Sequence, residues 1–355
     1  MLLLDSGVFS LIKNNFRNKL AELFYFRLGI DITHPVQIYG IINTRCNAKC
    51  KTCPYWRTND FSELPASSWI KGLRSLKSFI GPFHINFSGG EPLLKKDLFE
   101  ILEYCKKANI SAGITTNGIL LNKTNIPMLI SLKLFNINIS IDSMDSKIHD
   151  ELRGVPGLLS KVKENVNYLN EYKERVKSSI RIVLKPLVFN QNIYELDKIV
   201  EYSNKMNLTG VNFQPILKWT KESEELFKVE NNALNDIINK LIVMKREGYN
   251  ILNSETSIKQ WALHFSKSMP KRNSPCVVAL RNLTIDPNGD ISLCGFRSSK
   301  IGNINSDDIN EIWYSKETRR LRKSLVDCKR LCMATCVVKR TWRDYAQLMV
   351  KLYKT

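Results

Sequence analysis

Three closely spaced cysteines constrain this chain more than any other feature of its sequence. Cys46, Cys50 and Cys53 form a Cys-x₃-Cys-x₂-Cys triplet directly after an apolar run. Three thiolates can hold three irons of a [4Fe–4S] cluster, which leaves the fourth iron open to bind and reduce a small molecule. Structural zinc is the alternative, but zinc takes four ligands, typically as two separated pairs. The triplet therefore favours a reactive iron–sulfur site.

A glycine-rich turn follows the next expected strand, at residues 84–87. Its residues are Gly89, Gly90, Glu91 and Pro92. Two glycines at a strand end let the backbone approach a ligand closely, and a Glu carboxylate can accept hydrogen bonds from an ammonium group. Alone this is an ordinary turn, but one strand–helix unit after the cysteine triplet it predicts a ligand site.

The triplet and this turn together resemble the radical S-adenosylmethionine (SAM) superfamily. Residues 115–118, 140–143 and 149–154 agree with the resemblance, which extends over residues 36–215. It implies an α/β fold, a partial (β/α)₆ TIM-like barrel with the cluster at the open end of the strands. It also implies that a reductant such as flavodoxin or ferredoxin drives cleavage of SAM. The resulting 5′-deoxyadenosyl radical would abstract hydrogen from a substrate carbon.

The resemblance also implies roles for individual residues. Cys46, Cys50 and Cys53 would bind the [4Fe–4S] cluster, whose open iron would chelate SAM. Glu91 would receive the SAM ammonium group, and Ser140, Asp142 and Arg153 would lie near its ribose and carboxylate. A surface ion pair is the alternative for Arg153. The expected SAM-binding residues are Gly89, Gly90, Glu91, Pro92, Asn117, Ser140, Asp142 and Arg153.

Alternating strand and helix patterns indicate how the chain is organised. Six apolar runs predict strands at residues 36–42, 84–87, 110–114, 135–141, 180–184 and 210–213. Helical patterns between them favour parallel strands with right-handed crossovers. We expect an N-terminal helical segment, the barrel, a bridging region and a cluster-binding domain, at residues 1–35, 36–215, 216–275 and 276–355.

Five further cysteines lie in the last eighty residues, which is not a core-packing pattern. They are Cys276, Cys294, Cys328, Cys332 and Cys336. Two alternating strands around Asn288–Gly289 predict a hairpin between the first two cysteines. The segment resembles the SPASM or shorter Twitch auxiliary-cluster domain of radical SAM enzymes. That domain uses seven or more cysteines in its full form, so five suggest one auxiliary [4Fe–4S] cluster.

The ligand set of this second cluster stays partly open. Cys276, Cys294 and Cys336 are the expected ligands, and either Cys328 or Cys332 completes the set. A zinc knuckle is the alternative, because four thiolates also suit zinc.

Residues 8–28 are expected to form an amphipathic helix. Its apolar stripe comprises Phe9, Ile12, Phe16, Leu20 and Leu23 or Phe24. We expect this stripe to dock on the barrel flank and bury Phe9, Phe16 and Phe24, since most amphipathic helices are structural. The alternative is peripheral contact with an anionic membrane, because Lys13, Arg17 and Lys19 accompany the stripe.

The net charge of +19 favours an anionic substrate or surface, or reflects a lysine-rich exterior. A basic run at residues 316–330 lacks interleaved aromatics, so nucleic-acid binding is disfavoured. Nine cysteines without a secretory signal favour a reducing, cytoplasmic compartment.

The substrate is not determined by these patterns. Relatives with this C-terminal domain often modify peptides or proteins, which slightly favours such a substrate, although only about 35 residues precede the barrel, short of an independent leader-binding domain. Lipids, sugars and polyol phosphates are alternatives. A tRNA-modifying enzyme and a non-enzymatic metal-binding protein are alternatives of a different class.

Overall fold

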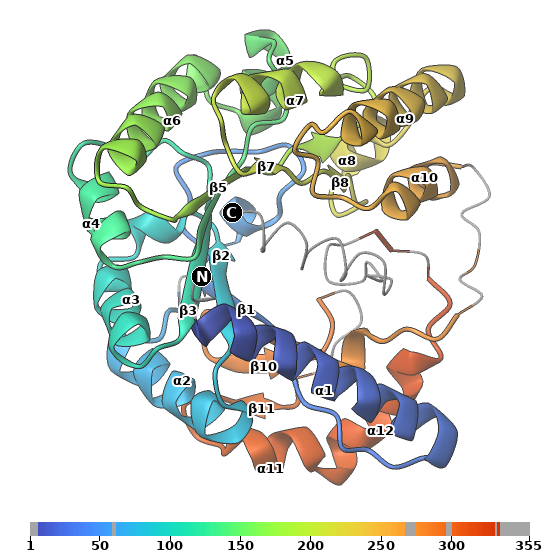
Figure 1. The fold of residues 1–355 in the computed structure, drawn as a ribbon. Coiled ribbons are helices and arrows are strands. Elements are labelled where there is room, and N and C mark those ends of the chain that lie inside the picture. Colours follow the sequence, from blue (N-terminus) through green and yellow to red (C-terminus); the bar gives the residue numbers. More distant parts are fainter. Residues whose placement is uncertain are drawn as a thin grey trace.

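A curved sheet forms the centre of the molecule (Figure 1). The computed structural model describes residues 6–58, 62–266, 271, 274–295, 300–330 and 332–333, with side chains from residue 13 onward. Within this part the sheet has the strand order β11-β10-β9-β1-β2-β3-β4-β5-β7. Strands β1 to β5 and β7 pair in parallel. They span Gln37–Asn43, His84–Gly89, Ser111–Thr116, Asn136–Ile139, Arg181–Leu184 and Gly210–Val211.

Helices cover the outer face of these parallel strands and follow them in an arc (Figure 1). They are α2 (Ala66–Ile80), α3 (Leu98–Lys107), α4 (Asn125–Ser131), α6 (Leu158–Arg175) and α7 (Leu196–Lys205). Alternate strand residues such as Ile85, Phe87 and Ile114 are fully buried in the core that these helices share. Because successive strand side chains point to opposite faces, the intervening residues line the inner face. All six expected strands are present, and the partial barrel is confirmed.

The C-terminal hairpin extends the barrel sheet instead of forming a sheet of its own. Strand β9 (Asn282–Ile285) pairs with β1 in parallel, and β10 (Asp290–Ser292) and β11 (Gly302–Asn303) continue in antiparallel. Helices α11 (Ile309–Tyr314) and α12 (Lys316–Val326) follow. The expected hairpin is present, but the sequence did not indicate that it would join the barrel edge beside β1.

The region between the barrel and this hairpin is mainly helical. It contains α8 (Lys221–Leu226), α9 (Asn231–Arg246) and α10 (Glu255–His264). A separate two-stranded parallel sheet joins β6 (Leu187–Val188) to β8 (Gln214–Pro215). None of the described helices is both long and apolar enough to cross a bilayer.

The N-terminal helix α1 (Ser6–Leu28) docks on the barrel, but through a polar stripe. Asn14 Nδ2 donates to Pro82 O at 2.6 Å, and Asn18 Nδ2 donates to Leu280 O at 3.1 Å. Glu22, four residues further, forms a buried ion pair with Arg281. Since Pro82 and Arg281 precede β2 and β9, α1 lies across the amino-terminal ends of the strands.

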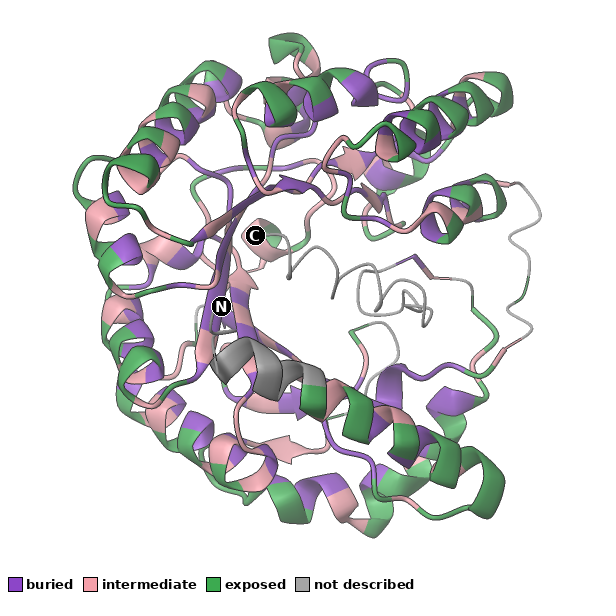
Figure 2. Ribbon diagram, viewed as in Figure 1, coloured by how far each residue is buried: buried purple, intermediate pink, exposed green. Residues whose placement is uncertain are grey.

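The expectation that α1 would bury its apolar stripe is therefore wrong. Phe16 is 50% exposed and Phe24 is 43% exposed, and Figure 2 shows most of the described part of α1 as exposed. Phe9 lies outside the residues with described side chains. The physical reason lies in the surface that α1 covers. At the amino-terminal ends of the strands, this surface exposes backbone carbonyl groups and the guanidinium of Arg281 to the helix. Amide and carboxylate side chains at helical spacing satisfy these groups better than aromatic rings do.

Candidate iron–sulfur and SAM site

The cysteine triplet lies in a loop that leaves the carboxyl end of β1 and leads into η1 (Tyr55–Arg57). The indole Nε1 of Trp56 donates to Cys50 O at 2.8 Å, and Ala48 N–H donates to the Cys46 sulfur at 3.4 Å. Cys50 is buried, whereas Cys46 and Cys53 are partly buried. Carboxyl ends of parallel strands are where open α/β sheets bind ligands, so the loop lies at the expected end of the barrel.

Helix α5 (Ser146–Arg153) holds one side of this loop. The backbone N–H groups of Lys49 and Lys51 donate to Arg153 O and Leu152 O at 3.1 and 2.9 Å. Gly154 caps the end of the helix with φ of 64°, and a Cβ at this position would lie 2.6 Å from Lys49 O. Only glycine allows the helix end and the cluster loop to approach this closely.

Two glycines support the other side of the loop: Gly89, which ends β2, and Gly90, which follows it. Gly90 N–H donates to Asn43 O at 2.9 Å, and Glu91 N–H donates to Arg45 O at 2.8 Å. A Cβ on Gly90 would lie 2.1 Å from Arg45 O, and one on Gly89 would lie 2.3 Å from Asn43 O. The close approach predicted from these glycines is therefore made to the chain's own backbone beside Cys46.

The Glu91 carboxylate is fully buried behind this turn. It accepts hydrogen bonds from Leu93 N–H at 3.2 Å, Thr116 Oγ1 at 2.8 Å and Asn117 N–H at 2.9 Å. Burial raises its pKa to about 7, although these three donors lower it. An ionised carboxylate offers about four acceptor positions, so at most one remains. Contact between Glu91 and the SAM ammonium stays a prediction.

Asn117 and Arg153 lie beside the sulfurs of the triplet. Asn117 Nδ2 lies 3.8 Å from the Cys46 sulfur and donates to Asn47 Oδ1 at 2.7 Å. Arg153 Nη1 lies 3.9 Å from the Cys50 sulfur. Donors directed at sulfur stabilise the negative charge that a cluster-bound thiolate carries.

Asp142 is fully buried, and its carboxylate is occupied by groups of the chain itself. Its Oδ2 accepts from Arg153 Nε at 2.6 Å, and its Oδ1 accepts from Leu187 N–H at 2.8 Å. Burial lowers the pKa of Arg153, but Asp142 and Cys50 outweigh burial and raise it. Ser140 follows β4 and is half-buried. The structure thus gives Asp142 an orienting position behind Arg153.

The chemical character of the triplet fits an iron cluster. Burial raises the pKa of Cys46 to about 11 and raises the pKa of Cys53 as well. Cluster ligands must be thiolates, and bound iron supplies the positive charge that stabilises them. Among the described residues, no three His, Cys, Asp or Glu side chains converge closely enough for a single metal ion. A cube does not require such convergence, because each thiolate binds a different iron.

Four of the five C-terminal cysteines lie together. Cys276 and Val278 form a small buried cluster, against which Cys294, Cys328 and Cys332 pack. Cys276 N–H donates to Val326 O at 2.9 Å, which ties its position to the end of α12. Cys336 lies outside the described residues. Cys328 and Cys332 both reach the group, so the choice between them as ligands stays open.

Two residues of the site were not expected from the sequence. Asn43 is fully buried at the end of β1, and its Nδ2 donates to Glu91 O at 2.8 Å. His149 Nδ1 accepts from Asp142 N–H at 3.2 Å, and its pKa falls to about 4, mainly because of burial. Asn43 could have been found from the sequence, because it is a polar residue at the end of an otherwise apolar strand. His149 lies inside the helical segment quoted for the resemblance, but no pattern indicated its partner.

Comparison with known families identifies the chemistry of this arrangement. The sequence model of the Radical SAM superfamily matches residues 41–200. This range includes the cysteine triplet, the glycine turn, Asp142 and Arg153. The chain belongs to the radical SAM superfamily. A second model, SPASM, an iron–sulfur cluster-binding domain, matches residues 276–337 and all five C-terminal cysteines. The predicted family, the enzymatic character and the SAM and iron–sulfur cofactors of this radical SAM enzyme are confirmed.

Individual relatives are more distant. The chain is 24% identical to the AdoMet-dependent heme synthase of Methanosarcina barkeri, over 81% of this chain and 84% of that protein. It is 28% identical to the PqqA peptide cyclase of Methylocella silvestris, over 37% of this chain and 36% of that protein. The structure of Streptococcus suis SuiB bound to S-adenosylmethionine has a TM-score of 0.67 and 21% identity, covering 86% of this chain and 71% of that one. SuiB has also been solved with its precursor peptide SuiA.

Proposed function

We propose that Cys46, Cys50 and Cys53 ligate the SAM-binding cluster and that Cys276, Cys294 and Cys336, with Cys328 or Cys332, hold one auxiliary [4Fe–4S] cluster. When bound, the cluster and SAM supply a 5′-deoxyadenosyl radical that abstracts hydrogen from a substrate carbon. The auxiliary cluster assists this reaction, and a small electron carrier such as flavodoxin or ferredoxin is the proposed reductant. A reducing cytoplasmic compartment suits these thiolate ligands.

Residues around the triplet would bind and orient SAM. Arg153 is held by Asp142 with its Nη1 directed at Cys50, so its remaining N–H groups can receive the SAM carboxylate. Asn117, fixed through Glu91, would lie against the methionine part of SAM near Cys46. The loop after β4, which contains Ser140, would contact the ribose. Glu91 and the backbone of Gly89, Gly90 and Pro92 complete this proposed pocket.

A peptide or protein is the substrate class that we propose. The observation that carries this proposal is the inner face of the barrel. Asn86 Nδ2 donates to Thr115 Oγ1 at 2.9 Å, and Asn138 Nδ2 donates to Asn86 Oδ1 at 3.0 Å. Uncharged amides and hydroxyls are suited to hydrogen bonding with peptide groups. The PqqA peptide cyclase relative and the peptide-bound SuiB neighbour support the same class.

A heme-related substrate is the second candidate, because the heme synthase relative aligns with most of this chain. The polar inner face favours it less, because a large apolar ring cannot form hydrogen bonds with the polar groups of Asn86 and Asn138. Lipids, sugars and polyol phosphates fit the net charge of the chain but have no separate observation in their favour.

The test uses anaerobically reconstituted enzyme reduced with dithionite. It should convert SAM to 5′-deoxyadenosine, measured by liquid chromatography. A candidate peptide substrate should increase that yield and change in mass. Asn138→Leu should weaken the peptide effect while leaving iron content and basal cleavage unchanged. Stimulation by an iron porphyrin with no effect of peptide would favour the second candidate, and absence of 5′-deoxyadenosine would contradict the proposed SAM site.

A further inference from the structure

Exposed apolar side chains are concentrated in one short segment of the surface. Among the described residues, eight of the fifteen large apolar side chains that are exposed lie between residues 16 and 32. Leu23 is 56% exposed and Leu28 is 61% exposed. Single exposed apolar residues are ordinary, but a contiguous set indicates a surface that contacts something else.

The apolar side of α1 is fixed outward by the way in which the helix docks. Asn18 Nδ2 donates to Leu280 O while its Oδ1 accepts from His34 N–H at 2.9 Å. Glu22 pairs with Arg281, and both side chains are buried. These bonds occupy one side of the helix, so Phe16, Leu20, Leu23 and Phe24 face away from the barrel. Rotating α1 to bury them would leave a buried carboxylate and guanidinium without partners.

The charge on this outward side has a single sign. Lys13, Arg17 and Arg27 are exposed among the apolar residues. Glu22 is the sole acidic residue of α1, and it is buried on the docking side. A helix face that combines large apolar side chains with cations and no acids is typical of helices that lie in the interface of an anionic bilayer.

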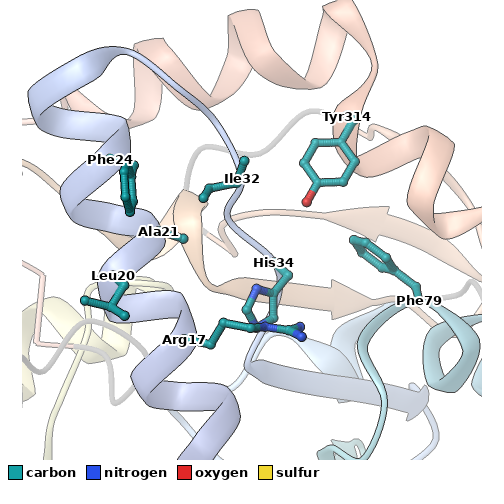
Figure 3. Close-up of a pocket in the computed structure, with 8 residues that line it drawn as sticks. All are labelled: Arg17, Leu20, Ala21, Phe24, Ile32, His34, Phe79 and Tyr314. Atoms are coloured by element: carbon teal, nitrogen blue, oxygen red, sulfur yellow. The ribbon is translucent and has the colours of Figure 1, made fainter.

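A pocket of about 440 Å³ continues this face inward, between α1 and the end of α11 (Figure 3). Leu20, Phe24, Ile32 and Phe79 supply its apolar walls, and Arg17 supplies a cationic group. Its volume lies within the range of about 300–1,000 Å³ that is usual for ligand pockets. An acyl chain beside a phosphate would meet complementary groups there.

We propose that the outward face of α1, with Ile30 and Ile32, binds an anionic phospholipid membrane. Charge favours this partner over two others. The C-terminal residues 337–355 contain five Lys or Arg and one Asp, so they would repel Lys13, Arg17 and Arg27. A second copy of the chain would bring the same three cations against each other. Negatively charged head groups attract them.

The proposed contact leaves the active site open to water. α1 crosses the amino-terminal ends of the strands, whereas the cysteine loop follows their carboxyl ends. β1 has seven residues, which at about 3.3 Å per residue separates the two ends by roughly 23 Å. SAM, substrate and reductant would then reach the cluster from the side away from the lipid. The proposal does not depend on the substrate.

Sedimentation with vesicles tests the proposal on full-length, reconstituted enzyme. The probes are vesicles of phosphatidylcholine alone and vesicles that also contain phosphatidylglycerol. The enzyme should partition at least tenfold better into the second kind, with a loss at high salt. Leu20→Ser, Leu23→Ser and Phe24→Ser together should lower this partitioning at least tenfold. Lys13→Gln, Arg17→Gln and Arg27→Gln together should do the same.

A matched control places the same change on exposed apolar residues elsewhere. Val243→Ser, Leu252→Ser and Leu263→Ser should leave partitioning unchanged. These residues are similarly exposed, but they lie in α9, α10 and the segment between them rather than in α1. All variants should keep wild-type iron content and 5′-deoxyadenosine formation, which separates this test from the proposed chemistry. Equal partitioning into both kinds of vesicle, or an equal loss in the control, would overturn the proposal. So would light scattering that shows a dimer in the wild type and a monomer in the α1 apolar variant.

Discussion

At the scale of single residues, the position of Gly90 could be predicted from its motif, but the group that it contacts could not. Its position one strand after the triplet indicated a ligand site, because glycine allows close backbone approach. In the structure the nearest group is Arg45 O, in the chain's own cluster loop. The sequence could place Gly90 near the cluster. It could not show that the loop backbone, at the residue directly before Cys46, would occupy the space of a Cβ.

Gly90→Ala should therefore damage the loop before it affects any bound molecule. The new Cβ would lie 2.1 Å from a backbone carbonyl, which must move. Overpacking of this kind costs typically about 1–3 kcal/mol. We expect a lower melting temperature and loss of iron from the first cluster. The control is Gly157→Ala, where no atom lies within 4 Å of the new Cβ, although φ there is positive at 74°. Equal iron content in the two variants would contradict this explanation.

His34 gives a pH-dependent prediction at the same scale. Burial, followed by the nearby Arg17 charge, lowers its pKa from 6.5 to about 4. As pH falls below 6.5, His34 becomes protonated in the unfolded chain but stays neutral in the folded chain. Stability is therefore full above pH 6.5 and is lost toward pH 4, by about 1.4 kcal/mol per pH unit. Between pH 6.5 and pH 4, the free energy of unfolding measured by denaturant titration should fall less for His34→Gln than for the wild type. A wild-type–variant difference that is constant with pH would exclude this role.

At the scale of elements, helices and strands were largely predictable, but the side on which α1 docks was not. Apolar periodicity marked the barrel strands because each buries one face under a helix. The same periodicity in α1 marked Phe16, Leu20 and Phe24, which the structure leaves exposed. The partner surface decided the outcome: carbonyls at the strand starts and Arg281 require polar side chains. Hydrophobic pattern alone carries no information about such a surface.

Asn18→Ala should consequently destabilise the enzyme more than Leu23→Ala. The Asn18 change removes bonds to Leu280 O and His34 N–H and leaves both groups buried, at about 1–3 kcal/mol for each unsatisfied group. Leu23 is 56% exposed, so its truncation should change stability by no more than about 0.5 kcal/mol. Thermal unfolding of the two variants, side by side, measures the difference. The reverse order would show that the apolar side carries the docking.

At the scale of the whole molecule, the sequence separated a barrel from a C-terminal cysteine domain, whereas the structure joins them in one sheet. The pairing of β1 with β9 links residues that are 245 apart in the chain, Gln37 and Asn282. Buried pairs of Glu22 with Arg281 and of Asp31 with Arg322 add to this junction. The hairpin could be predicted from its Asn-Gly turn and alternation. Its partner could not, because local patterns do not specify distant pairing.

Iron content tests the two-cluster organisation. Reconstituted wild-type enzyme should hold about eight irons per chain, from two cubes. Replacing Cys46, Cys50 and Cys53 by Ala should leave about four irons and abolish 5′-deoxyadenosine formation. Cys105→Ala is the matched control, since this buried thiol lies in the apolar core and its loss should leave iron content unchanged. A wild-type content of about four irons per chain, together with bound zinc, would contradict the presence of an auxiliary iron–sulfur cluster.

The β1–β9 pairing also determines when the barrel can be completed during synthesis. A ribosome releases β1 about 245 residues before its neighbour β9. Until then one edge of β1 presents unpaired N–H and C=O groups, which can pair with the wrong chain. The nascent barrel would therefore remain an open sheet until nearly four-fifths of the chain has emerged. Chaperone occupancy should peak in that interval and fall once Ile285 leaves the exit tunnel.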